Sequence, residues 1–138
     1  MTRNLRTTKA AKREKHKLMV VDDSNIIRNR IARVVEAGRI PAVTVVGMAR
    51  NGMEALHLCH EHWPDVITMD LTMPEMDGIV CTENLVRINP DVLILVVSAL
   101  NDKATALEAL QKGAHGFVCK PFTDDQLADA LNELLEAP

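Results

Sequence analysis

The chain has 138 residues, of which 47% are apolar and 25% charged, with a net charge of −3. This length predicts one domain that folds around its own core without a metal or a disulfide. No apolar run reaches the ~18 residues of a membrane span, and the N-terminus lacks the apolar stretch of a secretion signal. Its three cysteines are far apart and form no CxxC pair, which predicts reduced thiols in a cytoplasmic protein.

The N-terminal residues differ in charge from the rest of the chain. Residues 1–17 carry seven lysines and arginines and one acidic residue, whereas the remainder carries nine basic and eighteen acidic residues. This first segment has too few large apolar residues to offset the entropy of ordering it. We expect residues 1–16 to be a basic extension and residues 17–138 to be the folded domain. The extension is either a solvated tail or an arm that contacts an acidic surface.

From residue 18 onward, short apolar runs alternate with helical patterns. The runs are continuous rather than alternating, which indicates strands buried on both faces, at 18–21, 42–47, 66–69, 92–97 and 116–119. Apolar residues recur at helical spacing at 27–35 and 127–135, and less regularly at 53–62 and 79–88. Ser24 and Thr123 stand where N-caps are expected, and Gly38 and Gly113 where helices should end. Five β–α units predict a doubly wound α/β domain with a parallel sheet and helices on both faces.

Chemically active residues follow directly after four of these runs. In a parallel sheet, functional side chains gather just past the carboxyl ends of the strands. The runs lead into Asp22 and Asp23, Asp70, Ser98, and Lys120. Clustered carboxylates favour a hard divalent cation such as Mg²⁺, and a nearby Lys and Ser would hold a group rich in anionic oxygens. Phosphoryl transfer fits this set, with Asp70 as the nucleophile that forms an acyl phosphate.

Four segments resemble the signatures of receiver domains of two-component response regulators, in particular the single-domain, CheY-like type. They are VVDDS, TMDLTMPEMDGI, VVSA and GAHGFVCKPF. They occur in the family's order, each at the end of a predicted strand, and the resemblance covers roughly residues 17–135. It implies a flavodoxin-like (βα)5 sheet with strand order 2-1-3-4-5.

The resemblance also implies a role for each matching residue. Asp70 would receive a phosphoryl group from a sensor histidine kinase or a histidine phosphotransfer protein, as in a phosphorelay. Asp23, Asp70 and the backbone carbonyl of Thr72 would bind Mg²⁺ or Mn²⁺ directly, with Asp22 acting through water. Lys120 would pair with the phosphoryl oxygens, and the peptide bond that follows it, to Pro121, would be cis.

Two further residues would form the switch. Ser98 would hydrogen-bond the phosphoryl group, and Phe117 would turn inward into the space that Ser98 leaves. Ser98 stands where Thr is commoner in the family, and Phe117 where Tyr is commoner. Phe117 could instead be a core residue, since a buried aromatic usually fills volume. Thr72, two residues after the acceptor, occupies a variable position, so the dephosphorylation rate does not follow from the sequence.

These features predict a stand-alone cytoplasmic response regulator rather than an enzyme with a separate product. It would catalyse its own phosphorylation and slow dephosphorylation. It would also change the affinity of the surface formed by the fourth helix, fifth strand and fifth helix, roughly residues 101–135, for a partner protein. No DNA-binding module is recognisable after residue 135, so a separate protein would carry the output if the chain is complete.

Three alternatives remain open. The domain could be a degenerate receiver that binds partners without phosphorylation, or the receiver fragment of a longer regulator. A phosphohydrolase with an aspartyl nucleophile is the third, but phosphatases of the haloacid-dehalogenase type carry a second Asp two residues after the nucleophile, where this chain has Thr72.

Overall fold

Five strands form one parallel sheet in the computed structural model, which describes residues 16–40, 42–99 and 103–136. Their order across the sheet is β2-β1-β3-β4-β5, as predicted. Each strand begins and ends within one or two residues of its predicted run. The strands are β1 (His16–Val21), β2 (Val43–Ala49), β3 (Val66–Asp70), β4 (Leu93–Ala99) and β5 (Gly116–Lys120).

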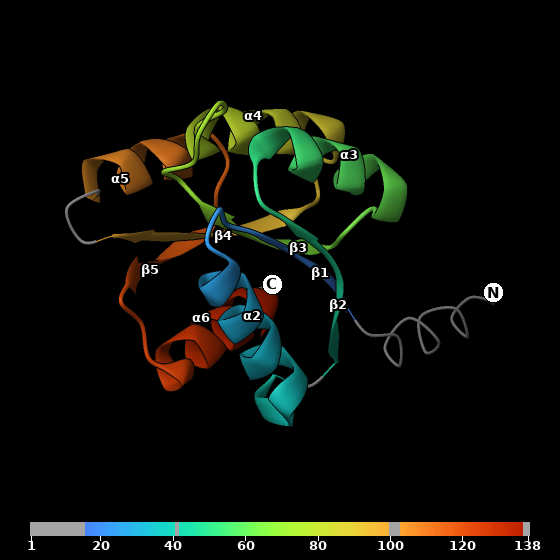
Figure 1. The fold of residues 1–138 in the computed structure, drawn as a ribbon, viewed down its shortest axis with the longest axis vertical. Coiled ribbons are helices and arrows are strands. Elements are labelled where there is room, and N and C mark those ends of the chain that lie inside the picture. The colour runs from blue at the N-terminus through green and yellow to red at the C-terminus, as the bar shows by residue number, and fades with distance from the viewer. Residues whose placement is uncertain (1–15, 41, 100–102, 137–138) are drawn as a thin grey trace.

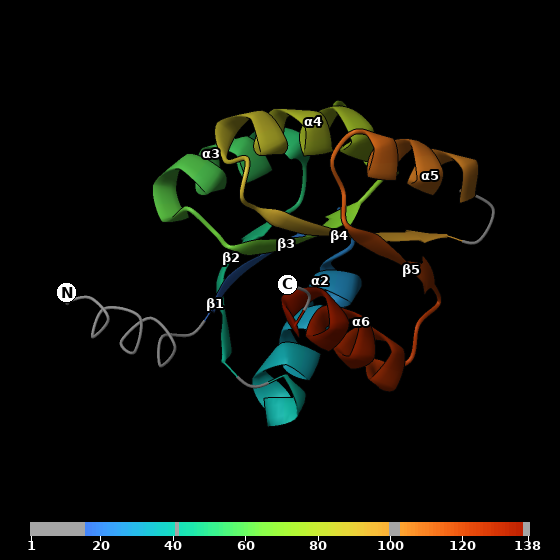
Figure 2. The same cartoon turned by 180° about the vertical axis from the view of Figure 1, so that it is seen from behind.

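Helices cover both faces of this sheet, as Figures 1 and 2 show. On one face lie α2 (Asn25–Val34), which continues into a π-helical turn (Val35–Arg39), and α6 (Asp124–Glu136). On the other face lie α3 (Gly52–His62), α4 (Gly78–Ile88) and α5 (Lys103–Gln111). The sheet is therefore the middle of three layers, which is why its strands read as continuous apolar runs.

The core is divided by the sheet into two clusters, because successive side chains of a strand point to opposite faces. In β1, Met19 and Val21 pack with residues of α3, α4 and α5, whereas Leu18 and Val20 pack with residues of α2 and α6. These four side chains are at most 1% exposed. Burial of this extent on both faces fixes the register of β1 and hence the position of the residues that follow it.

Local polar residues set where the helices begin and end. Ser24 accepts a hydrogen bond from the Ile27 N–H (3.3 Å), as predicted for an N-cap. Thr123 Oγ1 accepts from the Gln126 N–H (3.0 Å) while Gln126 Oε1 accepts from the Thr123 N–H (2.9 Å), which is a reciprocal capping box. The predicted stops at Gly38 and Gly113 have φ angles of 86° and 122°, left-handed values that favour glycine.

The predicted basic extension lies outside the described residues, apart from His16, which begins β1. Within the described part of the chain, every helix is too short or too polar to traverse a lipid bilayer. All three cysteines are free: Cys59 and Cys81 are buried in the core and Cys119 is half-buried on β5.

Candidate functional site at the carboxyl edge of the sheet

The loop after β1 presents two carboxylates with different environments. Asp22 is 1% exposed, whereas Asp23 faces solvent. Asp22 Oδ1 accepts a hydrogen bond from the Ser24 N–H (2.9 Å), which holds the carboxylate against the start of α2. The Arg28 guanidinium donates to the Asp22 backbone carbonyl (2.6 Å) and fixes the same loop from one turn along the helix.

Asp70 ends β3 at the centre of the sheet and is 2% exposed. Its Oδ1 accepts hydrogen bonds from the Thr72 N–H (3.1 Å) and the Thr72 hydroxyl (3.3 Å). The chain then folds back so closely that a Cβ added at Gly78 would lie 2.4 Å from the Asp70 carbonyl oxygen. Glycine is required at that position because any side chain would push α4 away from the acceptor loop.

The tertiary structure brings the three predicted carboxylates together. One oxygen from each of Asp22, Asp23 and Asp70 lies within 4.8 Å of the others, and this is the only such group of metal-ligating side chains in the described part of the chain. Asp70 Oδ2 is buried with no hydrogen-bond partner among the described residues. Buried carboxylate oxygens normally have partners, so this donor set fits a hard divalent cation with oxygen ligands such as Mg²⁺.

Lys120 supplies the positive charge of the cluster. Its ammonium lies 3.0 Å from Asp22 Oδ2 and 3.5 Å from Asp70 Oδ1. The Lys120–Pro121 peptide bond is cis, as predicted. Burial lowers the pKa of Lys120, but the Asp22 and Asp70 carboxylates more than offset it, so the pKa is raised above its ordinary value. Lys120 therefore remains fully protonated beside the carboxylates.

The environment of Asp70 disfavours its charge. Burial, followed by the negative charge of Asp22, raises the pKa of Asp70 to about 6, despite the opposing charge of Lys120. One ammonium is not enough to neutralise three carboxylates in this space. A bound cation would relieve the repulsion, which is the electrostatic reason that the cluster should bind one.

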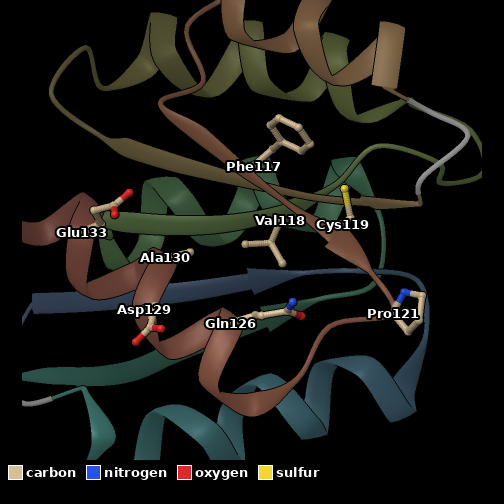
Figure 3. Close-up of a pocket in the computed structure, with 8 residues that line it drawn as sticks. All are labelled: Phe117, Val118, Cys119, Pro121, Gln126, Asp129, Ala130 and Glu133. Carbon is tan, nitrogen blue, oxygen red and sulfur yellow. The ribbon is translucent and has the colours of Figure 1, made fainter.

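The predicted switch residues occupy two different environments. Ser98 lies in β4 beside the cluster and is 3% exposed, and among the described residues its hydroxyl makes one long hydrogen bond, to the Ala99 carbonyl (3.4 Å). Phe117 lies on β5 and is 36% exposed. The alternative interpretation of Phe117 as a core residue does not fit this exposure, and in Figure 3 its ring projects from β5 on the side away from α6.

Sequence reasoning did not identify two arginines next to this site. Arg28 holds the Asp22 carbonyl, and Arg30, two residues further along α2, donates to the carbonyl of Phe122 in the loop after Lys120. Both bind backbone oxygens, which every residue possesses, so no motif in the sequence indicates them. The metal-ligand role predicted for the Thr72 carbonyl stays a prediction.

Comparisons with known proteins agree with this geometry. Residues 18–132 match the family described as the response regulator receiver domain. The chemotaxis protein CheY of Bacillus subtilis (strain 168) is 36% identical over 120 residues, which are 87% of this chain and 98% of that protein. The response regulator domain of Thermotoga maritima CheB is 33% identical, with a TM-score of 0.76 over 91% of this chain and 100% of that one.

A third similar structure supports the fold alone. The match is to a CheX–CheY–BeF3–Mg²⁺ complex from Borrelia burgdorferi, with a TM-score of 0.84. It covers 93% of this chain and 95% of that chain, at 24% sequence identity.

Proposed function

This chain belongs to the response regulator receiver family, and we propose that it works there as a CheY-like, phosphorylation-controlled switch in the cytoplasm. The observation that carries the proposal is the position of Asp70, whose buried carboxylate lies beside Asp22, Asp23 and the Lys120 ammonium. This arrangement combines a nucleophile, a cation-binding set and a fixed positive charge at one point.

The proposed reaction transfers a phosphoryl group from a phosphohistidine of a kinase or phosphotransfer protein. A carboxylate oxygen of Asp70 attacks the phosphorus, the P–N bond breaks with its electron pair left on the histidine nitrogen, and an acyl phosphate forms. The Lys120 ammonium pairs with phosphoryl oxygens as charge builds up on them. Bound Mg²⁺, held by Asp22, Asp23 and Asp70 and by the proposed Thr72 carbonyl, would neutralise charge on the same oxygens.

The proposed output runs from Ser98 to the surface formed by α5, β5 and α6. Within the described ranges Ser98 Oγ makes one long hydrogen bond, so it can rotate towards a phosphoryl group at little cost. Such a movement would leave space beside β5 for Phe117, which is exposed in this conformation. The described part of the proposed output surface is residues 103–135, because residues 101 and 102 lie outside the described ranges.

A groove on this surface provides a place for a partner protein. It has a volume of about 580 Å³ and lies between β5 and α6, with Phe117 and Val118 from the strand and Asp129 and Glu133 from the helix (Figure 3). Inward movement of Phe117 would change its shape. We infer that the phosphorylated and unphosphorylated forms bind a partner at this groove with different affinities.

The basic extension remains part of the proposal as an arm for an acidic surface. Residues 1–17 are strongly basic, whereas the described part of α6 contains five acidic residues and no basic one. The two alternatives for the domain itself also remain as proposals: binding without phosphorylation, and a place in a longer regulator.

Intact-mass analysis after incubation with phosphoramidate, with Mg²⁺ or with EDTA, tests the proposal. We expect a single phosphoryl adduct that depends on Mg²⁺ and is absent from Asp70→Asn. Lys120→Ala should still bind Mg²⁺ and accept the group, but hydrogen exchange of β5 and α6 should no longer respond to phosphorylation. An adduct at another residue would contradict the assignment of Asp70. No adduct, with Mg²⁺ binding intact, would favour the phosphorylation-independent binding module.

A further inference from the structure

A single arginine connects the two loops that form the candidate site. Arg30 lies on α2, which begins directly after the loop that carries Asp22 and Asp23. Its Nη2 donates to the Phe122 carbonyl (2.7 Å), two residues after Lys120. Its Nε donates to Asp124 Oδ1 (3.3 Å) at the start of α6. The guanidinium also lies 4.7 Å from the centroid of the Phe122 ring.

These three contacts hold the backbone that follows Lys120. Phe122 is 3% exposed, and its ring packs in the cluster between the sheet and helices α2 and α6. Arg30 binds the carbonyl of this residue and stacks on its ring, so both the backbone and the side chain are fixed relative to α2. Guanidinium suits this task because its planar fork can donate in two directions while its face contacts an aromatic ring.

The position of Lys120 depends on that backbone. Its ammonium must reach both Asp22 Oδ2 and Asp70 Oδ1, at 3.0 Å and 3.5 Å. A small movement of the loop would draw the ammonium away from Asp70. Its hydrogen bonds to the carboxylates would then weaken steeply, because they depend on short distances. Among the described residues, the hydrogen bond of Arg30 to Phe122 is the only one from an α2 side chain to the backbone of residues 121–123.

We propose that Arg30 is a positioning residue for Lys120: it fixes the loop after β5 against α2 and thereby sets the distance between the ammonium and the phosphoryl group on Asp70. This inference rests on the proposed function, because the distance matters most when a phosphoryl group is transferred. Arg30 does not touch the reacting atoms and therefore acts only through Lys120.

Arg30→Met tests the proposal, because methionine keeps an unbranched apolar side chain and removes the guanidinium. The matched control is Arg33→Met, since Arg33 is an exposed arginine on the same helix with no described hydrogen bond or ion pair. With phosphoramidate and saturating Mg²⁺, we expect Arg30→Met to slow phosphorylation about tenfold, as is common when a supporting hydrogen bond is removed. Mg²⁺ affinity should stay near the wild-type value, and Arg33→Met should change neither quantity. Arg30→Lys should restore part of the rate through one donor.

A double-mutant cycle separates positioning from general destabilisation. If Arg30 acts through Lys120, Arg30→Met should slow phosphorylation much less in a Lys120→Ala background than in the wild type. An equal loss in both backgrounds, or a wild-type rate in Arg30→Met, would overturn the proposal.

A second measurement does not depend on phosphorylation. The ¹³Cε resonance of Lys120 in the unphosphorylated protein should shift in Arg30→Met and not in Arg33→Met. An unchanged resonance would also count against the positioning role. If the wild type itself takes up no phosphoryl group, the proposed function fails, and the resonance alone decides whether Arg30 positions Lys120.

Discussion

Asp70→Asn should make the metal-free protein more stable at neutral pH, although it removes the phosphorylation site. In the folded protein the pKa of Asp70 is raised to about 6, from an ordinary value of 3.8, by burial and by the charge of Asp22. Each unit of pKa difference between the folded and unfolded states corresponds to about 1.36 kcal/mol. Ionised Asp70 therefore lowers the free energy of unfolding by roughly 3 kcal/mol at pH 7. Asparagine removes the charge and still offers an acceptor oxygen to the Thr72 N–H.

The net gain should be smaller than that figure. Lys120 loses one of its two carboxylate partners in Asp70→Asn and keeps Asp22, at 3.0 Å. We therefore expect the free energy of unfolding to rise by about 1–2 kcal/mol at pH 7.5 in EDTA. Urea unfolding measures this directly, and Asp91→Asn, at an exposed carboxylate away from the cluster, is the control for loss of one negative charge.

The pH dependence provides a second check with a defined sign. Between about pH 4 and pH 6 the folded wild type keeps a proton on Asp70 that the unfolded chain has released, so its stability falls as the pH rises through this window. Asp70→Asn should lack this fall. Mg²⁺ should stabilise the wild type by about 2.7 kcal/mol at a hundred times its dissociation constant, and the variant much less. A variant that is less stable than wild type at pH 7.5, or a difference that does not vary with pH, would refute the electrostatic reasoning.

Three further outcomes follow from the packing. Gly78→Ala places a Cβ 2.4 Å from the Asp70 carbonyl, so urea unfolding should show a loss of roughly 1–3 kcal/mol and calorimetry a weaker Mg²⁺ site. Gly116→Ala, whose Cβ meets only a side chain at 3.6 Å, should leave Mg²⁺ binding unchanged. Thr123→Ala removes a helix cap and should cost about 1 kcal/mol of unfolding free energy, and no loss would mean the cap is dispensable. Thiol titration of the native protein should label Cys119 first and the two buried thiols only on unfolding; rapid labelling of all three would contradict the packing.

Much of the site could be predicted because it depends on local sequence and on one topological rule. Asp22, Asp23, Asp70 and Lys120 all occur where an apolar run ends, and the carboxyl ends of parallel strands meet along one edge. The structure confirms that these four side chains lie together. The strands and two of the helix N-caps could also be predicted from the sequence, because burial and capping depend on residues that are close together in the chain.

Other features depend on groups that are distant in sequence. Arg30 contacts Phe122 across 92 residues, and its partner atom is a backbone carbonyl that carries no sequence signal. The outward position of Phe117 depends on which neighbours cover the edge strand β5, and the same sequence pattern is compatible with a buried ring.

By itself, then, the sequence determined which residues stand at the strand ends and which chemistry they share, because strand boundaries and motifs are local properties. Only the tertiary structure decided how strongly the charges of Asp22, Asp70 and Lys120 act on one another. That strength depends on burial and on distances of a few ångströms between separate loops. Electrostatic energies vary steeply with both quantities, and neither is encoded at any one position of the chain.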